Sequence, residues 1–207
     1  MTDATAPAGL VPASVSALAL DAAAVSRRLN DPERLGPGEA PPPGGVASAV
    51  LVPVVLHPEP TLLLTLRAAT LSSHAGQVAF PGGRMDPGET PEQAALREAA
   101  EEIGLDPRLP RVTGRLPGLV TGTGYHIIPV LALLEPPLNL TPSPDEVDLA
   151  FEYELAPLLD PALPETRTAL WKGQRRSFAV WPHARHYIWG ATAAIMHSLA
   201  ALLREED

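Results

Sequence analysis

Hydrophobic residues change their spacing along the chain, and these changes divide it into an N-terminal stretch, a strand-rich middle and a helical end. From Pro12 to Leu29 apolar residues recur every three or four positions, which predicts a helix at about residues 12–30. Residues 36–45 (GPGEAPPPGG) are a linker, because their prolines and glycines disfavour both helix and strand. The pattern therefore predicts an N-terminal extension, 1–45, followed by a folded domain, 46–207.

After the linker, runs of aliphatic and β-branched residues predict a series of short strands. The first two, Val46–Leu56 and Thr61–Arg67, form a pair separated by the turn-type segment His57–Pro60. Val147–Leu155 alternates apolar and polar positions, which is typical of a half-buried strand. The other predicted strands are Gln77–Phe80, Leu116–Val120, His126–Leu134 and Ser177–Trp181.

Two further segments have a helical pattern, Pro91–Ile103 and Gly190–Arg204. The second is apolar enough either to pack on the sheet or to pair with another subunit in a homodimer. Its apolar positions include Ile195, Met196, Leu199, Leu202 and Leu203. Central strands with helices packed outside predict the α/β (α+β) class, with an α/β/α sandwich on a mixed sheet.

Composition and charge narrow the function. A chain of 207 residues is long enough for one sizeable core. The net charge of −9 argues against a nucleic-acid binder that depends on a basic surface, but a small anionic substrate can bind through cations. Absence of cysteine excludes disulfides, thiolate nucleophiles and zinc–thiolate sites. Without a secretory signal or an apolar run long enough for a bilayer, we expect a cytoplasmic protein with no membrane partner.

The helix at Pro91–Ile103 is well defined at both ends. Thr90 suits the N-cap, Pro91 suits the first helical position, and Gln93 completes a capping box. Gly104 is a natural residue for the C-terminal cap. We therefore expect a short helix whose limits are fixed by local sequence.

This helix carries its charges where they oppose its stability. Glu98, Glu101 and Glu102 share one stripe, where like charges cost a few tenths of a kcal/mol per pair. They also lie near the negative end of the helix dipole. Arg97 offsets part of the repulsion through Glu101, but one cation cannot neutralise three carboxylates. The pattern suits either a solvated acidic face or a site completed by a hard divalent cation such as Mg²⁺.

The preceding glycine-rich loop favours the cation site. Phe80-Pro81-Gly82-Gly83 opens a loop that runs to Glu89, and its glycines allow close approach of the backbone to a phosphate or a metal. The complete string is Gly83, five residues, Glu89, seven residues, Arg97-Glu98-Ala99, one residue, Glu101-Glu102, one residue, Gly104-Leu105.

This string resembles the Nudix box at every fixed position. Ala99 is the one departure, since the family generally has a bulkier apolar residue there. The resemblance implies a Nudix-type α/β/α sandwich and a site in which Glu98, Glu101 and Glu102 bind Mg²⁺ or Mn²⁺. It also implies a further metal ligand from the carbonyl of Gly82 or Gly83. Arg97 and Glu89 are expected to pair and to brace the loop against the helix.

The segment before the box resembles the coenzyme A pyrophosphatase subfamily. Leu63–Arg67 reads LLTLR, and His74–Gly83 reads HAGQVAFPGG; Ala68 stands where a serine is commoner. Residues 116–130 and 187–193 also resemble this subfamily, so the similarity covers roughly 45–200. It implies hydrolysis of coenzyme A or acyl-CoA to 3′,5′-ADP and (acyl-)4′-phosphopantetheine.

Within this motif two residues are candidates for the substrate site. Arg67 is suited to a phosphate, because a guanidinium offers two parallel donors. His74 is suited either to donate to a phosphate or to order the loop. For the general base, Glu98 and Glu102 are candidates within the box, and Glu146 is a candidate outside it.

Other basic and aromatic residues can be interpreted either as ligand-binding or as structural residues. The run Lys172, Arg175 and Arg176 suits a ribose 3′-phosphate, although a solvated turn is favoured. The tryptophans are favoured as core residues rather than adenine platforms; they are Trp171, Trp181 and Trp189.

Three alternative functions remain open at this point. A pyrophosphatase for ADP-ribose or another nucleoside diphosphate derivative has the same box. An isoprenoid diphosphate isomerase is disfavoured, since that chemistry often uses cysteine. A nucleotide sensor without activity is disfavoured by the complete carboxylate set.

Overall fold

The computed structural model describes residues 20–30, 45–171 and 173–204. Eight strands form the main sheet, in which β3-β2-β1-β7-β5 is the principal order, β4 pairs with β1, β6 with β7 and β8 with β2. The strands β1 and β7 are parallel, whereas β1 and β2 are antiparallel, so the sheet is mixed. The strands of this sheet are β1 Val46–Val55, β2 Thr61–Arg67, β3 Val78–Ala79, β4 Gly82–Arg84, β5 Arg111–Arg115, β6 Leu119–Val120, β7 Tyr125–Leu134 and β8 Val147–Glu154.

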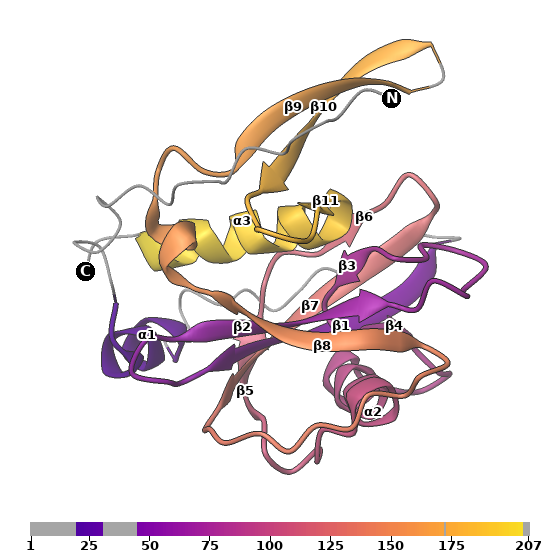
Figure 1. The fold of residues 1–207 in the computed structure, drawn as a ribbon. Coiled ribbons are helices and arrows are strands. Elements are labelled where there is room, and N and C mark those ends of the chain that lie inside the picture. The colour runs from indigo at the N-terminus through magenta and orange to yellow at the C-terminus, as the bar shows by residue number, and fades with distance from the viewer. Residues whose placement is uncertain (1–19, 31–44, 172, 205–207) are drawn as a thin grey trace, which may run out of the picture.

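Helices cover both faces of this sheet (Figure 1). The helix α2 (Pro91–Ile103) packs on one face, where Ala94, Ala95 and Ala99 are fully buried. The helices α1 (Ala22–Leu29) and α3 (Gly190–Arg204) lie on the other face. The predicted fold class, an α/β/α sandwich on a mixed sheet, is therefore confirmed.

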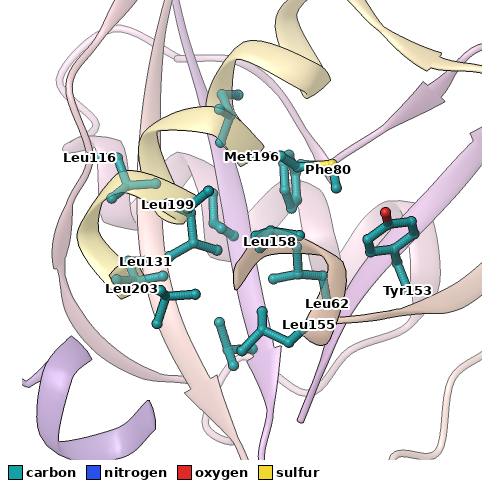
Figure 2. Close-up of a cluster of buried hydrophobic side chains, with 14 of the residues drawn as sticks. Leu62, Phe80, Leu116, Leu131, Tyr153, Leu155, Leu158, Met196, Leu199 and Leu203 are labelled. Atoms are coloured by element: carbon teal, nitrogen blue, oxygen red, sulfur yellow. The ribbon is translucent and has the colours of Figure 1, made fainter. Parts of the chain in front are cut away.

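The helix α3 packs on the sheet. Met196, Leu199 and Leu203 of α3 gather with the strand residues Leu62 and Leu131 in the core shown in Figure 2. All the apolar α3 residues named from the sequence are at most 7% exposed. Their apolar surface is thus used within the subunit. Homodimer formation stays a prediction without support from these side chains.

Local sequence determines both ends of α2, as expected. The Thr90 hydroxyl accepts from the Gln93 backbone N–H, and the Gln93 side chain accepts from the Thr90 backbone N–H at 2.9 Å. At the other end Gly104 has a φ of 66°, and its N–H donates to the carbonyl of Ala100. The helix therefore presents its carboxylates at fixed positions.

A second, three-stranded sheet differs from the expectation of a single sheet. It contains β9 (Glu165–Trp171), β10 (Gln174–Trp181) and β11 (Ile188–Trp189), and a short 3₁₀ helix (Ala156–Leu159) precedes it. The hairpin β9–β10 projects from the body beside α3 (Figure 1). Only Ser177–Trp181 of this sheet was predicted, because β9 is polar and exposed along Glu165–Leu170.

Three tryptophans were expected in the core, and the structure divides them. Trp181 is fully buried, and its indole N–H donates to the carbonyl of Ala193 at 3.0 Å. Trp189 is 39% exposed, so the core prediction is wrong for it: it extends from the two-residue strand β11. The Trp171 side chain and Lys172 lie outside the described residues. In β8, Leu149 is 40% exposed, contrary to the alternation.

The structure describes only part of the predicted N-terminal extension. The helix predicted at 12–30 is described from Ala22 to Leu29, where the Asp21 side chain caps it by accepting from the Ala24 N–H at 2.7 Å. Residues 12–19 of that prediction, and 36–44 of the predicted linker, lie outside the described residues. In the part of the chain that the structure describes, no helix has the length and hydropathy to span a membrane.

Candidate functional site

The glycine strand β4 places the backbone against a carboxylate. A Cβ atom at Gly82 would lie 2.4 Å from the Ala49 carbonyl oxygen on β1, so the strand pairing requires glycine there. A Cβ atom at Gly83 would lie 2.5 Å from the Glu98 side-chain Cδ. The segment predicted as a loop is thus a short strand, and its missing side chains make room for β1 and for Glu98.

Arg97 joins the loop to the helix. Its Nε donates to Glu89 Oε1 at 2.8 Å and its Nη2 donates to Glu89 Oε2 at 3.0 Å. The same Nη2 reaches the carbonyl of Arg84 at 3.0 Å, and Nη1 donates to Glu98 at 3.0 Å and to Glu101 at 3.2 Å. One guanidinium therefore holds three carboxylates and the end of β4 together.

Glu102 is the most buried carboxylate of the helix, with a side chain 4% exposed. It accepts from the Gly82 backbone N–H at 3.1 Å, and it lies 3.5 Å from Arg67 Nη1. Burial raises the pKa of Glu102 to about 7, and the charges of Glu98 and Glu146 act in the same direction. The Gly82 N–H and Arg67 oppose this shift without overcoming it.

Glu98 and Glu146 complete the acidic cluster. Burial is the main cause that raises the pKa of Glu98, whose side chain is 16% exposed; Arg97 opposes it, and Glu101 and Glu146 add to it. Glu146 is exposed just before β8, and its carbonyl accepts from the Ala68 N–H at 2.9 Å. Glu101 is 57% exposed and contacts Arg97. Glu98, Glu102 and Glu146 therefore act on one another electrostatically.

The two predicted substrate residues have different surroundings. Arg67 extends to Glu102, and its Nε is buried without a hydrogen-bond partner among the described residues. His74 is exposed at a φ of 57°, and its Nδ1 lies 3.0 Å from Gln77 Oε1 within its own loop. Arg67 thus belongs to the carboxylate cluster, whereas the contacts of His74 are those of a loop-ordering residue.

The cluster has the chemistry of a divalent-cation site, although it is not a preformed one. Within the described ranges, no three His, Asp or Glu side chains are placed to hold a metal together. Arg97 and Arg67 contact the carboxylates instead. The available ligand atoms are all oxygens, as hard divalent cations prefer, and Gly83 leaves space against Glu98. The charged form of the buried Glu102 is unfavourable, and a bound cation would remove this cost. The residues present therefore fit Mg²⁺ or Mn²⁺.

Sequence reasoning missed one polar pair beside this cluster. Arg84, the last residue of β4, donates through Nη2 to the Tyr125 hydroxyl at 2.7 Å. No local pattern could have found it, since Arg84 and Tyr125 lie far apart in the chain and belong to different strands. By contrast, Arg175 and Arg176 from the predicted basic run are exposed on β10, in the projecting hairpin.

Comparisons with known proteins find a family and several relatives of this chain. The profile of the NUDIX domain family matches residues 46–172. The uncharacterized Nudix hydrolase NudL of Photorhabdus laumondii is 44% identical over 154 residues, which are 74% of this chain and 82% of that protein. The same-named Escherichia coli protein is 41% identical over 155 residues, 74% of this chain and 80% of its own length. A solved Caenorhabditis elegans Ap4A hydrolase is 26% identical at a TM-score of 0.46, covering 52% of this chain and 80% of its own.

Proposed function

This chain belongs to the Nudix family, and from that membership we propose that it is a metal-dependent pyrophosphohydrolase whose substrate is coenzyme A or an acyl-CoA. Membership of the family supports hydrolysis of nucleoside diphosphate derivatives. Coenzyme A as the particular substrate is supported by the contact between Arg67 and Glu102, which are 3.5 Å apart. This contact joins the upstream motif, which resembles the coenzyme A subfamily, to the carboxylate helix of the box.

In the proposed mechanism Glu98, Glu101 and Glu102 hold Mg²⁺ or Mn²⁺, with the carbonyl of Gly82 or Gly83 as a further ligand. Such a cation would supply positive charge to neutralise the diphosphate and would make the attacking water more acidic. The Glu101 side chain is 57% exposed, so it is free to turn.

The remaining steps belong to the side chains of the chain itself. Arg67, whose side chain is 26% exposed, binds a phosphate oxygen. Arg97 and Glu89 keep the loop in place while charge builds up on the leaving phosphate. The proton of the attacking water passes to a carboxylate: Glu98, Glu102 or Glu146. Of these, Glu102 has a pKa near neutrality and Glu146 is the most open to water.

Product identity tests the substrate and the scissile bond together. We expect the protein, incubated with Mg²⁺ or Mn²⁺ and a panel of diphosphates, to convert coenzyme A to 3′,5′-ADP and 4′-phosphopantetheine, as separated by chromatography. Faster turnover of ADP-ribose than of coenzyme A would overturn the substrate. Absence of product from every member of the panel would overturn the hydrolase.

Gly83→Ala tests whether the position of Glu98 matters. The added methyl group would meet the Glu98 carboxyl at 2.5 Å, and the end of a flexible side chain moves at little cost to the fold. We expect kcat to fall by about 10–100-fold, since small displacements of a reacting group have effects of this size. The melting temperature should change little.

Gly122→Ala is the matched control, because nothing lies within 4 Å of its Cβ position. It should retain both activity and stability. Equal kcat values in Gly83→Ala and Gly122→Ala would mean that the Gly83–Glu98 contact has no role in turnover.

A further inference from the structure

Gly83 and Arg84 face opposite sides of the main sheet. Successive residues of a strand alternate between faces. The Cβ position of Gly83 points at Glu98 of α2, so Arg84 projects on the side that α3 covers elsewhere. The glycine strand thus carries the carboxylate cluster on one face and a guanidinium, one residue later, on the other.

The Arg84 side chain crosses a strand to reach its partner. Arg84 pairs with Ser48 of β1, and Tyr125 of β7 pairs with Val46 of the same strand. The guanidinium therefore spans β1 to donate to the Tyr125 hydroxyl at 2.7 Å, and its Cζ lies 5.5 Å from the centre of the Tyr125 ring. Tyr125 fixes the guanidinium in an extended position, close to the glycine strand.

Ser48 belongs to β1, the strand between β4 and β7, and it is the cross-strand partner of Arg84. It shares a face with Arg84, as cross-strand partners do. The serine is 4% exposed, and its Oγ has no hydrogen-bond partner among the described residues. A buried hydroxyl without a partner costs free energy. Its position beside an exposed guanidinium points to a polar ligand.

We propose that Arg84, positioned by Tyr125 and assisted by the Ser48 hydroxyl, binds the phosphate on the ribose of the substrate. The inference rests on the proposed function, because coenzyme A carries a 3′-phosphate on the ribose whose 5′ position bears the diphosphate. Arg84 is the last residue of β4 and directly follows Gly83, whose Cβ position meets Glu98, so the guanidinium leaves the same end of the strand that carries the carboxylate cluster.

The test compares coenzyme A with 3′-dephospho-coenzyme A, which differ only in the ribose phosphate. We expect Arg84→Gln to lower the ratio of kcat/KM for coenzyme A over dephospho-coenzyme A by about 10-fold or more, through KM, because a hydrogen bond between charged groups is lost. The Arg84 carbonyl still accepts from Arg97 in this variant, so the loop is retained. Tyr125→Phe and Ser48→Ala should lower the ratio less.

Arg108→Gln is the matched control, since Arg108 is 87% exposed and pairs with Asp106 outside the site. Its ratio should equal that of the unmodified protein. An equal loss on both substrates in Arg84→Gln would overturn the inference and leave Arg84 as a link between β4 and β7.

A binding measurement separates this inference from the proposed function. We expect 3′,5′-ADP to raise the melting temperature more than 5′-AMP does, and Arg84→Gln to remove the difference. If coenzyme A is not hydrolysed but this difference is seen and is lost in the variant, the proposed function fails and the Arg84 site stands. If 3′,5′-ADP and 5′-AMP stabilise the protein equally, the Arg84 site is overturned whatever the activity.

Discussion

Glu98→Gln and Glu102→Gln should each lower kcat by about 10³-fold at saturating Mg²⁺, because each removes an anionic oxygen ligand that a divalent cation requires. Glutamine keeps the size of the side chain, so the loss is one of charge. Glu102→Gln also retains an acceptor for the Gly82 N–H, which keeps β4 in place. The measurement is steady-state turnover of the best substrate, with metal concentration varied for each protein.

Glu135→Gln is the control, since Glu135 is an exposed carboxylate that follows β7 and lies outside the cluster. It should have the turnover of the unmodified protein. Unchanged product formation by Glu98→Gln and Glu102→Gln would contradict the metal-dependent mechanism. If excess Mn²⁺ restores Glu98→Gln, Glu98 acts mainly through metal affinity.

Strong local signals allowed α2 to be predicted residue by residue. The capping box of Thr90 and Gln93 and the left-handed Gly104 are formed within the helix and its flanks, so no distant part of the chain is needed to place them. The strands β1 and β2 were predicted for a similar reason: both are rich in aliphatic and β-branched residues, and a proline-containing turn joins them.

Strands that lack such signals depend on tertiary contacts. The strand β4 begins with two glycines, which are unfavourable in strands, and it forms because β1 pairs with it. The strand β5 contains Gly114 at a register shift, which hides its alternation. Among the described strands, β9 pairs with β10 alone, and its exposed polar residues resemble a loop.

The candidate site divides in the same way, into residues that local sequence places together and contacts that depend on the tertiary fold. Glu98, Glu101, Glu102, Arg97 and Glu89 lie on one helix and the loop before it, so their spacing in the sequence already determines their arrangement. The contact of Arg67 with Glu102 and the charge of Glu146 near both carboxylates join separate strands to that helix. The Arg84–Tyr125 pair depends on the order of β4, β1 and β7, which spacing cannot provide.

The metal-free protein should become less stable as the pH rises from about 4.5 to about 7, and Glu102 is the main cause, with a contribution of the same sign from Glu98. The pKa of Glu102 is raised from 4.5 to about 7 in the folded state. Between these values the folded protein binds more protons at this site than the unfolded chain does, so the free energy of unfolding falls with increasing pH. The full shift corresponds to about 3 kcal/mol, at 1.36 kcal/mol per pKa unit.

Glu102→Gln should remove most of this dependence, because glutamine is neutral at every pH. At pH 8 and without metal, we expect the variant to be more stable than the unmodified protein by about 1–3 kcal/mol, which is a rise in melting temperature of several degrees. Loss of the contact with Arg67 keeps the gain below the full value. Thermal unfolding from pH 5 to 8, with chelator present, measures it.

Added Mg²⁺ should reverse the order of the two proteins. A cation that binds the folded state stabilises it by mass action, and only the unmodified protein retains all three carboxylates for it. The buried charge that destabilises the metal-free protein is then the charge that holds the metal. Stability and activity are therefore opposed at Glu102. Equal stability of the two metal-free proteins at pH 8 would show that Glu102 carries no such penalty.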